Sequence, residues 1–113
     1  MKNNETQENT IFQSNYSIID KVTILRLETN PTPSASNNVR VTCKDSFGKI
    51  QNNLFFAYPD KNIDGVCVYT TLLFCLSNNT TVTLKGGDYT NREGDKFITG
   101  VIIENPNNKN QTE

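Results

Sequence analysis

The stretch from Asp64 to Gly87 constrains the fold most, because it combines the one long apolar run of the chain with a strand-like alternation. At 100° per residue, the larger apolar residues of its first half share one side of a helix, whereas a strand would carry apolar residues on both faces. That side holds Val66, Tyr69, Leu72, Leu73 and Leu76, and the opposite side holds Thr70 and Ser77. We therefore expect a buried helix that begins at an Asp64 N-cap and ends at Ser77-Asn78-Asn79. A long strand over 66–76 is the alternative.

Five segments, one of them in the second half of this stretch, have the β-branched or alternating composition of strands. The segment from Val39 to Lys44 alternates most cleanly and places Val39, Val41 and Cys43 inward. Gly86-Gly87-Asp88 is expected to turn into the last strand, whose Phe97, Val101 and Ile103 share a face. The five expected strands are Ile18 to Glu28, Val39 to Lys44, Leu54 to Tyr58, Thr81 to Lys85 and Phe97 to Glu104.

The order of three strands, one helix and two strands predicts an α+β, mainly β domain. This β-β-β-α-β-β order is that of the OB-fold, a small five-stranded Greek-key barrel, which we expect to be antiparallel. The domain is assigned to residues 16–104, between flexible polar tails at 1–15 and 105–113. If the helix prediction fails, the alternative is an all-β sandwich or barrel with a hairpin at Ser77 to Thr80.

Composition removes several classes of function. The chain has 113 residues, 11 basic and 12 acidic side chains and no run of like charge, which argues against nucleic acid as the main partner. No histidine is present, so the usual base of serine and cysteine nucleophiles is missing. We expect no enzyme, no catalytic residues, no cofactor and no membrane span.

Asp60 to Gly65 matches the opening of a calcium-binding loop, in which oxygens at alternate positions converge and glycine permits a sharp turn. The match fails at Thr71, where the loop requires a bidentate glutamate. We expect a polar turn before the helix, and no metal site.

The three cysteines are Cys43, Cys67 and Cys75. In a reducing compartment they are expected to be small buried hydrophobes. In an oxidising compartment, Cys43 would pair with Cys67 or with Cys75. The sequence starts without a secretory signal, although an exported protein whose signal has been removed would look the same.

The segment from Tyr69 to Leu84, YTTLLFCLSNNTTVTL, resembles the helix, polar turn and strand of bacterial AB5 toxin B subunits, closest to the subtilase-cytotoxin and typhoid-toxin branch. The resemblance implies an OB-fold, a pentameric ring and binding of host glycans, often sialylated. Tyr16-Ser17 looks like the aromatic-serine pair of the glycan site in that branch. There Tyr16 would stack on a sugar and Ser17 would bond the sialic acid carboxylate, with Lys49 as an additional cation.

The sequence departs from that branch in two places. Cys43 falls near the first disulfide cysteine of the family, but no cysteine lies near Ala57, where its partner is expected. The basic residue that the family carries in the strand after the helix is replaced at about Thr83, with Lys85 nearby but shifted.

These observations lead to one main functional expectation and two alternatives. We expect a non-enzymatic glycan-binding subunit that forms a homo-pentamer, with a toxin A subunit as a further partner, and that is secreted if a signal has been removed. A small protein-interaction or structural domain without a small-molecule site is the first alternative. A barrel that binds single-stranded nucleic acid is the second, and it lacks positive charge beside Phe55, Phe56 and Tyr58.

Overall fold

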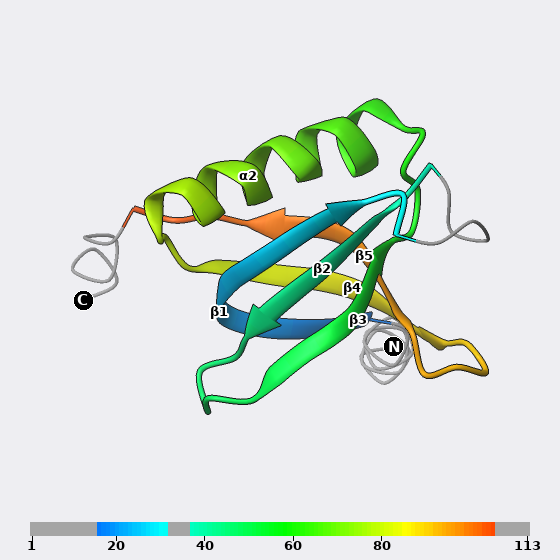
Figure 1. Cartoon of the computed structure of the whole chain (residues 1–113), viewed down its shortest axis with the longest axis horizontal. Helices are drawn as coiled ribbons and strands as arrows, with labels where there is room; N and C mark the ends of the chain where they lie inside the picture. Colours follow the sequence, from blue (N-terminus) through cyan, green and yellow to red (C-terminus); the bar gives the residue numbers. More distant parts are fainter. Residues whose placement is uncertain (1–15, 32–36, 106–113) are drawn as a thin grey trace, which may run out of the picture.

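Residues 16–31 and 37–105 are described by the computed structural model, which is a closed five-stranded barrel with one helical segment (Figure 1). Its elements are β1 (Tyr16–Thr29), β2 (Val39–Lys44), β3 (Ile50–Phe56), the π-helical η2 (Asn62–Cys67), α2 (Val68–Asn78), β4 (Val82–Thr90) and β5 (Lys96–Ile102). The predicted tails lie outside the described residues except for Asn105, and so do residues 32–36 of the connection between the first two strands.

The strands follow each other around the barrel in the order β1-β2-β3-β5-β4, and β4 returns to β1. All neighbours are antiparallel except β3 and β5, which pair in parallel. The predicted α+β, mainly β, OB-fold-like barrel and its element order are thus confirmed. The parallel β3–β5 pair makes the barrel mainly, rather than wholly, antiparallel.

One bent strand closes the barrel. The first half of β1 pairs with β4 and its second half pairs with β2, with a register shift between the halves. The bend lies at Lys21, whose φ is 51°. Thr83 of β4 holds it, because its Oγ1 accepts a 3.2 Å hydrogen bond from the Lys21 N–H and donates a 2.7 Å bond to Asp20 Oδ1.

The helix is confirmed, but its start differs from the prediction. The expected N-cap, Asp64, lies inside η2, and the first helical carbonyl is that of Lys61, which accepts from the N–H groups of Gly65 and Val66. Glycine is required at position 65, because a Cβ there would lie 2.2 Å from the carbonyl oxygen of Pro59. Tight packing against the preceding loop therefore explains Gly65, rather than a cation-binding turn.

The end of the helix follows the prediction more closely. Asn79 adopts the left-handed conformation with φ of 54°, and Thr80 N–H donates a 3.0 Å bond to the carbonyl of Cys75. This is the i to i+5 bond of a Schellman-type stop, which asparagine tolerates.

The buried face of the helix is rotated from the predicted one. Val68, Leu72 and Cys75 are buried, whereas Val66 is 59% and Leu73 is 44% exposed. The π-helical turn contains more residues per turn than an α-helix and so displaces Val66 from the α-helical phase. Tyr69 and Leu76 pack against the core from its edge, as expected.

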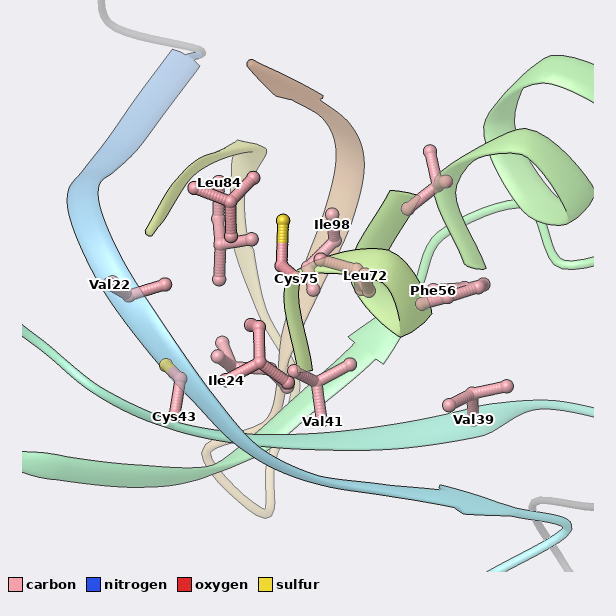
Figure 2. Close-up of a cluster of buried hydrophobic side chains, with 13 residues drawn as sticks. Val22, Ile24, Val39, Val41, Cys43, Phe56, Leu72, Cys75, Leu84 and Ile98 are labelled. Atoms are coloured by element: carbon pink, nitrogen blue, oxygen red, sulfur yellow. The ribbon is translucent and has the colours of Figure 1, made fainter. Parts of the chain in front are cut away.

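The core lies between the helix and the inner face of the barrel. In Figure 2, Leu72 and Cys75 of α2 lie among the barrel side chains, which include Ile98 and Leu84. The inward positions Val39, Val41 and Cys43 of β2 are buried as predicted.

The last two strands depart from their predicted pattern. Ile98 is the buried residue of β5. Of the residues predicted to share one face, Val101 packs against the core, whereas Ile103 is exposed. Gly86 and Gly87 lie within β4, so the predicted turn there is wrong. The chain turns instead at Asn91 to Asp95, with Gly94 at φ of 86°.

Candidate functional site

The candidate site lies at the end of the barrel away from α2. In Figure 1, α2 runs along the top, and the dark blue start of β1 and the β4–β5 connection lie below it. Ile19 is paired with the buried Leu84, and Ser17 is paired with Gly86, two residues nearer the end of each strand. Because side chains alternate along a strand, Ser17 continues the inward-facing column beyond the core.

Lys96 extends a second inward-facing column to the same end. It pairs with the buried Leu54, and it precedes the buried Ile98 by two residues on β5. The strand period of two therefore places Lys96 on the face of Ile98, at the point where the core gives way to solvent.

Ser17, Lys85 and Lys96 line one small notch at this end, together with the backbone of Gly86 and Gly87. The volume of the notch is about 20 Å³, which is enough for about one water-sized or carboxylate-oxygen-sized group. The Ser17 hydroxyl lies 3.4 Å from the carbonyl oxygens of both Gly86 and Gly87. Such contacts are long for O–H···O bonds, so a better acceptor can compete for this proton.

Lys96 supplies the positive charge at the notch, whereas Lys85 lies between Leu84 and Gly86 on β4 and therefore points to the outer face by the same strand period. No ion pair joins Lys85 or Lys96 to an acidic group among the residues whose side chains are described. The stem of Lys85 lies over Gly100, where a Cβ would come within 3.0 Å of its Cε atom. A hydroxyl donor on the same inward-facing end as a lysine is suited to a carboxylate or another small anion.

Gly86 shapes the floor of the notch. A Cβ at this position would lie 2.7 Å from the carbonyl oxygen of Phe97, so only glycine allows β4 and β5 to approach this closely. The same Cβ would stand 3.7 Å from Ser17 Oγ. The missing side chain therefore both closes the barrel and leaves Ser17 accessible.

The residues predicted for a glycan site are placed in two different regions. Tyr16 begins β1, and its backbone pairs with Gly87, although its side chain is outside the description. Ser17 lines the notch, whereas Lys49 belongs to the β2–β3 turn, at the lower left of Figure 1 and away from the β4–β5 connection. The structure therefore brings Tyr16 and Ser17 to one end of the barrel and does not bring Lys49 to them.

Lys96 was missed because the face predicted for the last strand holds Phe97, Val101 and Ile103 and does not include Lys96. The signal that identifies it is the alternation from the buried Ile98, which is visible only once the inward residue of β5 is known. Thr83 stands at about the position where the AB5 B subunits carry a basic residue. Its hydroxyl forms the two hydrogen bonds that hold the β1 bend.

A larger hollow of about 350 Å³ lies at the other end, near the start of the helix. None of its described lining residues is charged; they are Thr29, Asn30, Asn37, Asn38, Val39, Phe56, Pro59, Gly65, Val66 and Tyr69. Asn38 already bonds both backbone groups of Phe56, at 3.2 and 3.1 Å, and the Asn37 amide donates to Asp60. Because these amides serve to join the loops, we assign this hollow a structural role.

Metal and thiol chemistry receive no assigned site. Within residues 16–31 and 37–105, no three His, Cys, Asp or Glu side chains are grouped to hold a metal ion. Cys43, Cys67 and Cys75 are all free thiols, the first and third buried and the second exposed. Burial, and then the charge of Asp45, raise the pKa of Cys43 to about 11, and burial raises the pKa of Cys75.

Comparisons with known proteins add no assignment. Neither the scan against protein-family models nor the search of curated proteins gives a match. In the described part of the chain, no helix has the length and apolar character that crossing a membrane requires.

Proposed function

We propose that this protein is a non-enzymatic glycan-binding module that recognises an acidic sugar of the sialic acid type. The observation that carries the proposal is the grouping of Ser17 and Lys96 at one notch at the end of the barrel. A carboxylate in this notch would accept a hydrogen bond from the Ser17 hydroxyl and lie on the same face as Lys96. Charge-assisted hydrogen bonds of this kind are about twice as strong as neutral ones.

The proposal includes assembly of several copies, as in the pentameric B subunits that the sequence resembles, with a toxin A subunit as a further partner. A notch that takes one carboxylate is a weak site by itself. Several sites on one assembly bind a glycan-bearing surface far more tightly than a single site, because each bound site raises the effective concentration of the next. The proposed role therefore depends on oligomer formation.

Titration calorimetry with sialyllactose tests the site directly. We expect Ser17→Ala to weaken binding by about tenfold or more, the effect of losing one hydrogen bond to a charged group. Lys96→Gln should weaken it as well. Ser46→Ala and Lys44→Gln change exposed residues of the same types outside the notch and should leave affinity unchanged.

Lys49→Gln separates the site that the resemblance implies from the site that the notch defines. If the notch is the site, Lys49→Gln leaves the affinity for sialyllactose unchanged. Loss of binding in Lys49→Gln but not in Lys96→Gln would contradict the assignment to the notch. Absence of sialyllactose binding by the folded wild-type protein would contradict the proposed function as a whole.

A protein-interaction domain is the second candidate function. The exposed side of the helical segment favours it, because Ile63, Val66, Leu73 and Phe74 present apolar surface and α2 has no charged residue. A chain that is monomeric and binds no acidic glycan would support this candidate over the first.

A further inference from the structure

The β2–β3 turn carries the most exposed large apolar side chain among the described residues. Phe47 is 93% exposed, and Ile50, at the start of β3, is 50% exposed. The turn projects from the barrel at the lower left of Figure 1, on the side away from α2. A convex tip cannot enclose a small molecule, so its apolar groups leave water only against a larger surface.

The backbone holds Phe47 outward in a turn of fixed shape. Asp45 Oδ1 accepts 2.9 Å bonds from the N–H groups of Phe47 and Lys49, and the Asp45 N–H donates a 2.9 Å bond to the Lys49 carbonyl. Gly48, at φ of 88°, lets the chain return toward β3. Because the turn is already ordered, little backbone freedom is lost when Phe47 contacts a partner.

Lysines flank the apolar tip on both sides in the chain. Lys44 pairs with Ile50 across the hairpin, so their side chains lie on the same face, and Lys49 is exposed in the turn itself. Neither lysine forms an ion pair within the described part of the chain. The carboxylate of Asp45, the one acidic residue of the turn, is engaged by backbone N–H groups and, at 3.5 Å, by Gln51. The tip therefore combines exposed apolar groups with a net positive charge.

We infer that the β2–β3 turn docks on an anionic phospholipid surface. Phe47 and Ile50 enter the boundary between headgroups and acyl chains, and the two lysines stay at the level of the lipid phosphates. Lysine suits such a surface, because its flexible stem carries a point charge that needs no fixed geometry of the partner. A pocket on another protein suits the turn less, because the Asp45 carboxylate and several backbone groups that could make directed contacts are already bonded within it.

Sedimentation with lipid vesicles tests the inference. The probes are vesicles of phosphatidylcholine alone and vesicles that also contain phosphatidylserine, and neither kind carries a sugar. We expect wild-type protein to bind the anionic vesicles more tightly, and we expect added salt to weaken that binding. Phe47→Ala should weaken it about tenfold, the effect of losing one buried aromatic side chain, and Lys49→Gln should weaken it about fivefold.

Tyr58→Ala and Lys61→Gln are the matched controls, because they change exposed residues of the same kinds in the β3–η2 connection. Both should leave vesicle binding unchanged. Phe47 is too exposed to support the core, so Phe47→Ala should unfold at the same urea concentration as wild-type protein.

A fluorescent residue at the tip shows whether the turn itself meets the lipid. The chain has no tryptophan, so Phe47→Trp introduces a single reporter. We expect its emission to shift to shorter wavelength with anionic vesicles, because the indole ring leaves water. Tyr58→Trp should show no shift.

Equal binding to the two kinds of vesicle, binding by Phe47→Ala as tight as that of wild-type protein, or vesicle binding without a shift in Phe47→Trp would overturn the inference. Absence of binding to both kinds would overturn it as well and would leave the exposed ring for a protein pocket. None of these outcomes bears on sialyllactose binding, because lipid phosphates rather than a sugar are recognised. The inference and the proposed function therefore stand or fall separately.

Discussion

Lys21 adopts a backbone conformation that residues with a side chain rarely adopt, at a cost of about 1–2 kcal/mol. The cost is offset by Thr83, whose hydroxyl bonds both the Lys21 N–H and the Asp20 carboxylate across the barrel. The bend could not be predicted from the sequence around Lys21, which reads as one uninterrupted strand. Its cause lies 62 residues away in the chain.

Replacing Thr83 with valine is expected to lower the free energy of unfolding by about 1–3 kcal/mol. Valine keeps the shape of threonine but leaves the partly buried Lys21 N–H without an acceptor. Urea denaturation measures the change, with Thr81→Val at the exposed position before β4 as the control. Equal stability of the two variants would show that the hydroxyl does not support the bend.

The cysteines are expected to differ sharply in reactivity. Because the thiolate is the reactive form, the raised pKa values and burial of Cys43 and Cys75 should make both slow to react in the folded protein. Exposed Cys67 should react with a thiol reagent at once, and all three should react after unfolding. Fast labelling that persists in Cys67→Ser would contradict this expectation.

Cys43 also gives a pH dependence of stability. Its folded pKa of about 11 is above its ordinary value of 9.0, so the folded state disfavours the thiolate. The stability associated with the protonated thiol is complete below about pH 9 and is lost as the pH rises toward about 11. Denaturation curves over this range should converge for wild-type protein and Cys43→Ala.

At the scale of elements, the sequence pattern predicted most of the strands, helices and turns that depend on residues close together in the chain. The alternation of β2, the helix between the third and fourth strands, and the Asp45 to Lys49 turn all follow from nearby residues. The start of the helix was misplaced because packing of Gly65 against Pro59, rather than a side-chain cap, determines it. Gly86-Gly87 was read as a turn because the contact that requires glycine there comes from β5, a different strand.

The β2–β3 turn depends on one carboxylate. The N–H of Lys49 and then the N–H of Phe47 donate 2.9 Å bonds to Asp45 Oδ1 and lower the pKa of Asp45 below its ordinary value of 3.8. The stability that this charge provides is therefore present above about pH 4 and is lost as the pH falls through the lowered pKa. The β2–β3 turn should therefore loosen in acid, where Asp45 loses its charge.

Asp45→Asn tests this pH dependence, because asparagine keeps an acceptor oxygen but removes the charge. We expect the variant to be less stable than wild-type protein at neutral pH and equally stable in strong acid. Urea midpoints at several pH values measure the difference, and Glu93→Gln, an exposed change in the β4–β5 turn, is the control. A difference that is the same at all pH values would exclude the charge as its cause.

At the scale of the whole molecule, the order of elements predicted the barrel, but the spatial neighbours of the strands could not be read from it. The parallel β3–β5 pair and the meeting of Ser17 with Lys96 both arise from closure of the barrel. The candidate site was therefore half predictable: the resemblance singled out Ser17, whereas the approach of Lys96 depends on which strand ends meet. Lys49 is at a different place for the same reason.

The uncharged outer side of the helix leads to a prediction about assembly. Leu73 and Phe74 are exposed on α2, and two copies of a face without charge meet without repulsion. We expect light scattering to give the mass of a pentamer for wild-type protein and a smaller mass for Phe74→Lys. Phe47→Lys, which changes the exposed aromatic residue of the β2–β3 turn, should leave the mass unchanged.

A monomeric wild-type protein at all concentrations tested would contradict this prediction and would remove multivalent binding from the proposed function. An oligomer that Phe74→Lys leaves intact would place the interface elsewhere on the barrel.

The bend in β1 also has a consequence for how the chain folds. The half of β1 that carries Ser17 pairs with β4, and the Ser17 hydroxyl meets a carbonyl 70 residues later in the chain. The loop entropy of such a distant contact is unfavourable until most of the barrel has formed, and barrels rich in distant contacts fold slowly, in about milliseconds to seconds. The β1–β2–β3 meander can form from neighbouring segments, whereas the notch is completed only when β4 arrives. Completion of the notch is thus a late event in folding, and a chain interrupted before β4 would retain Ser17 without the strand that forms the other wall of the notch.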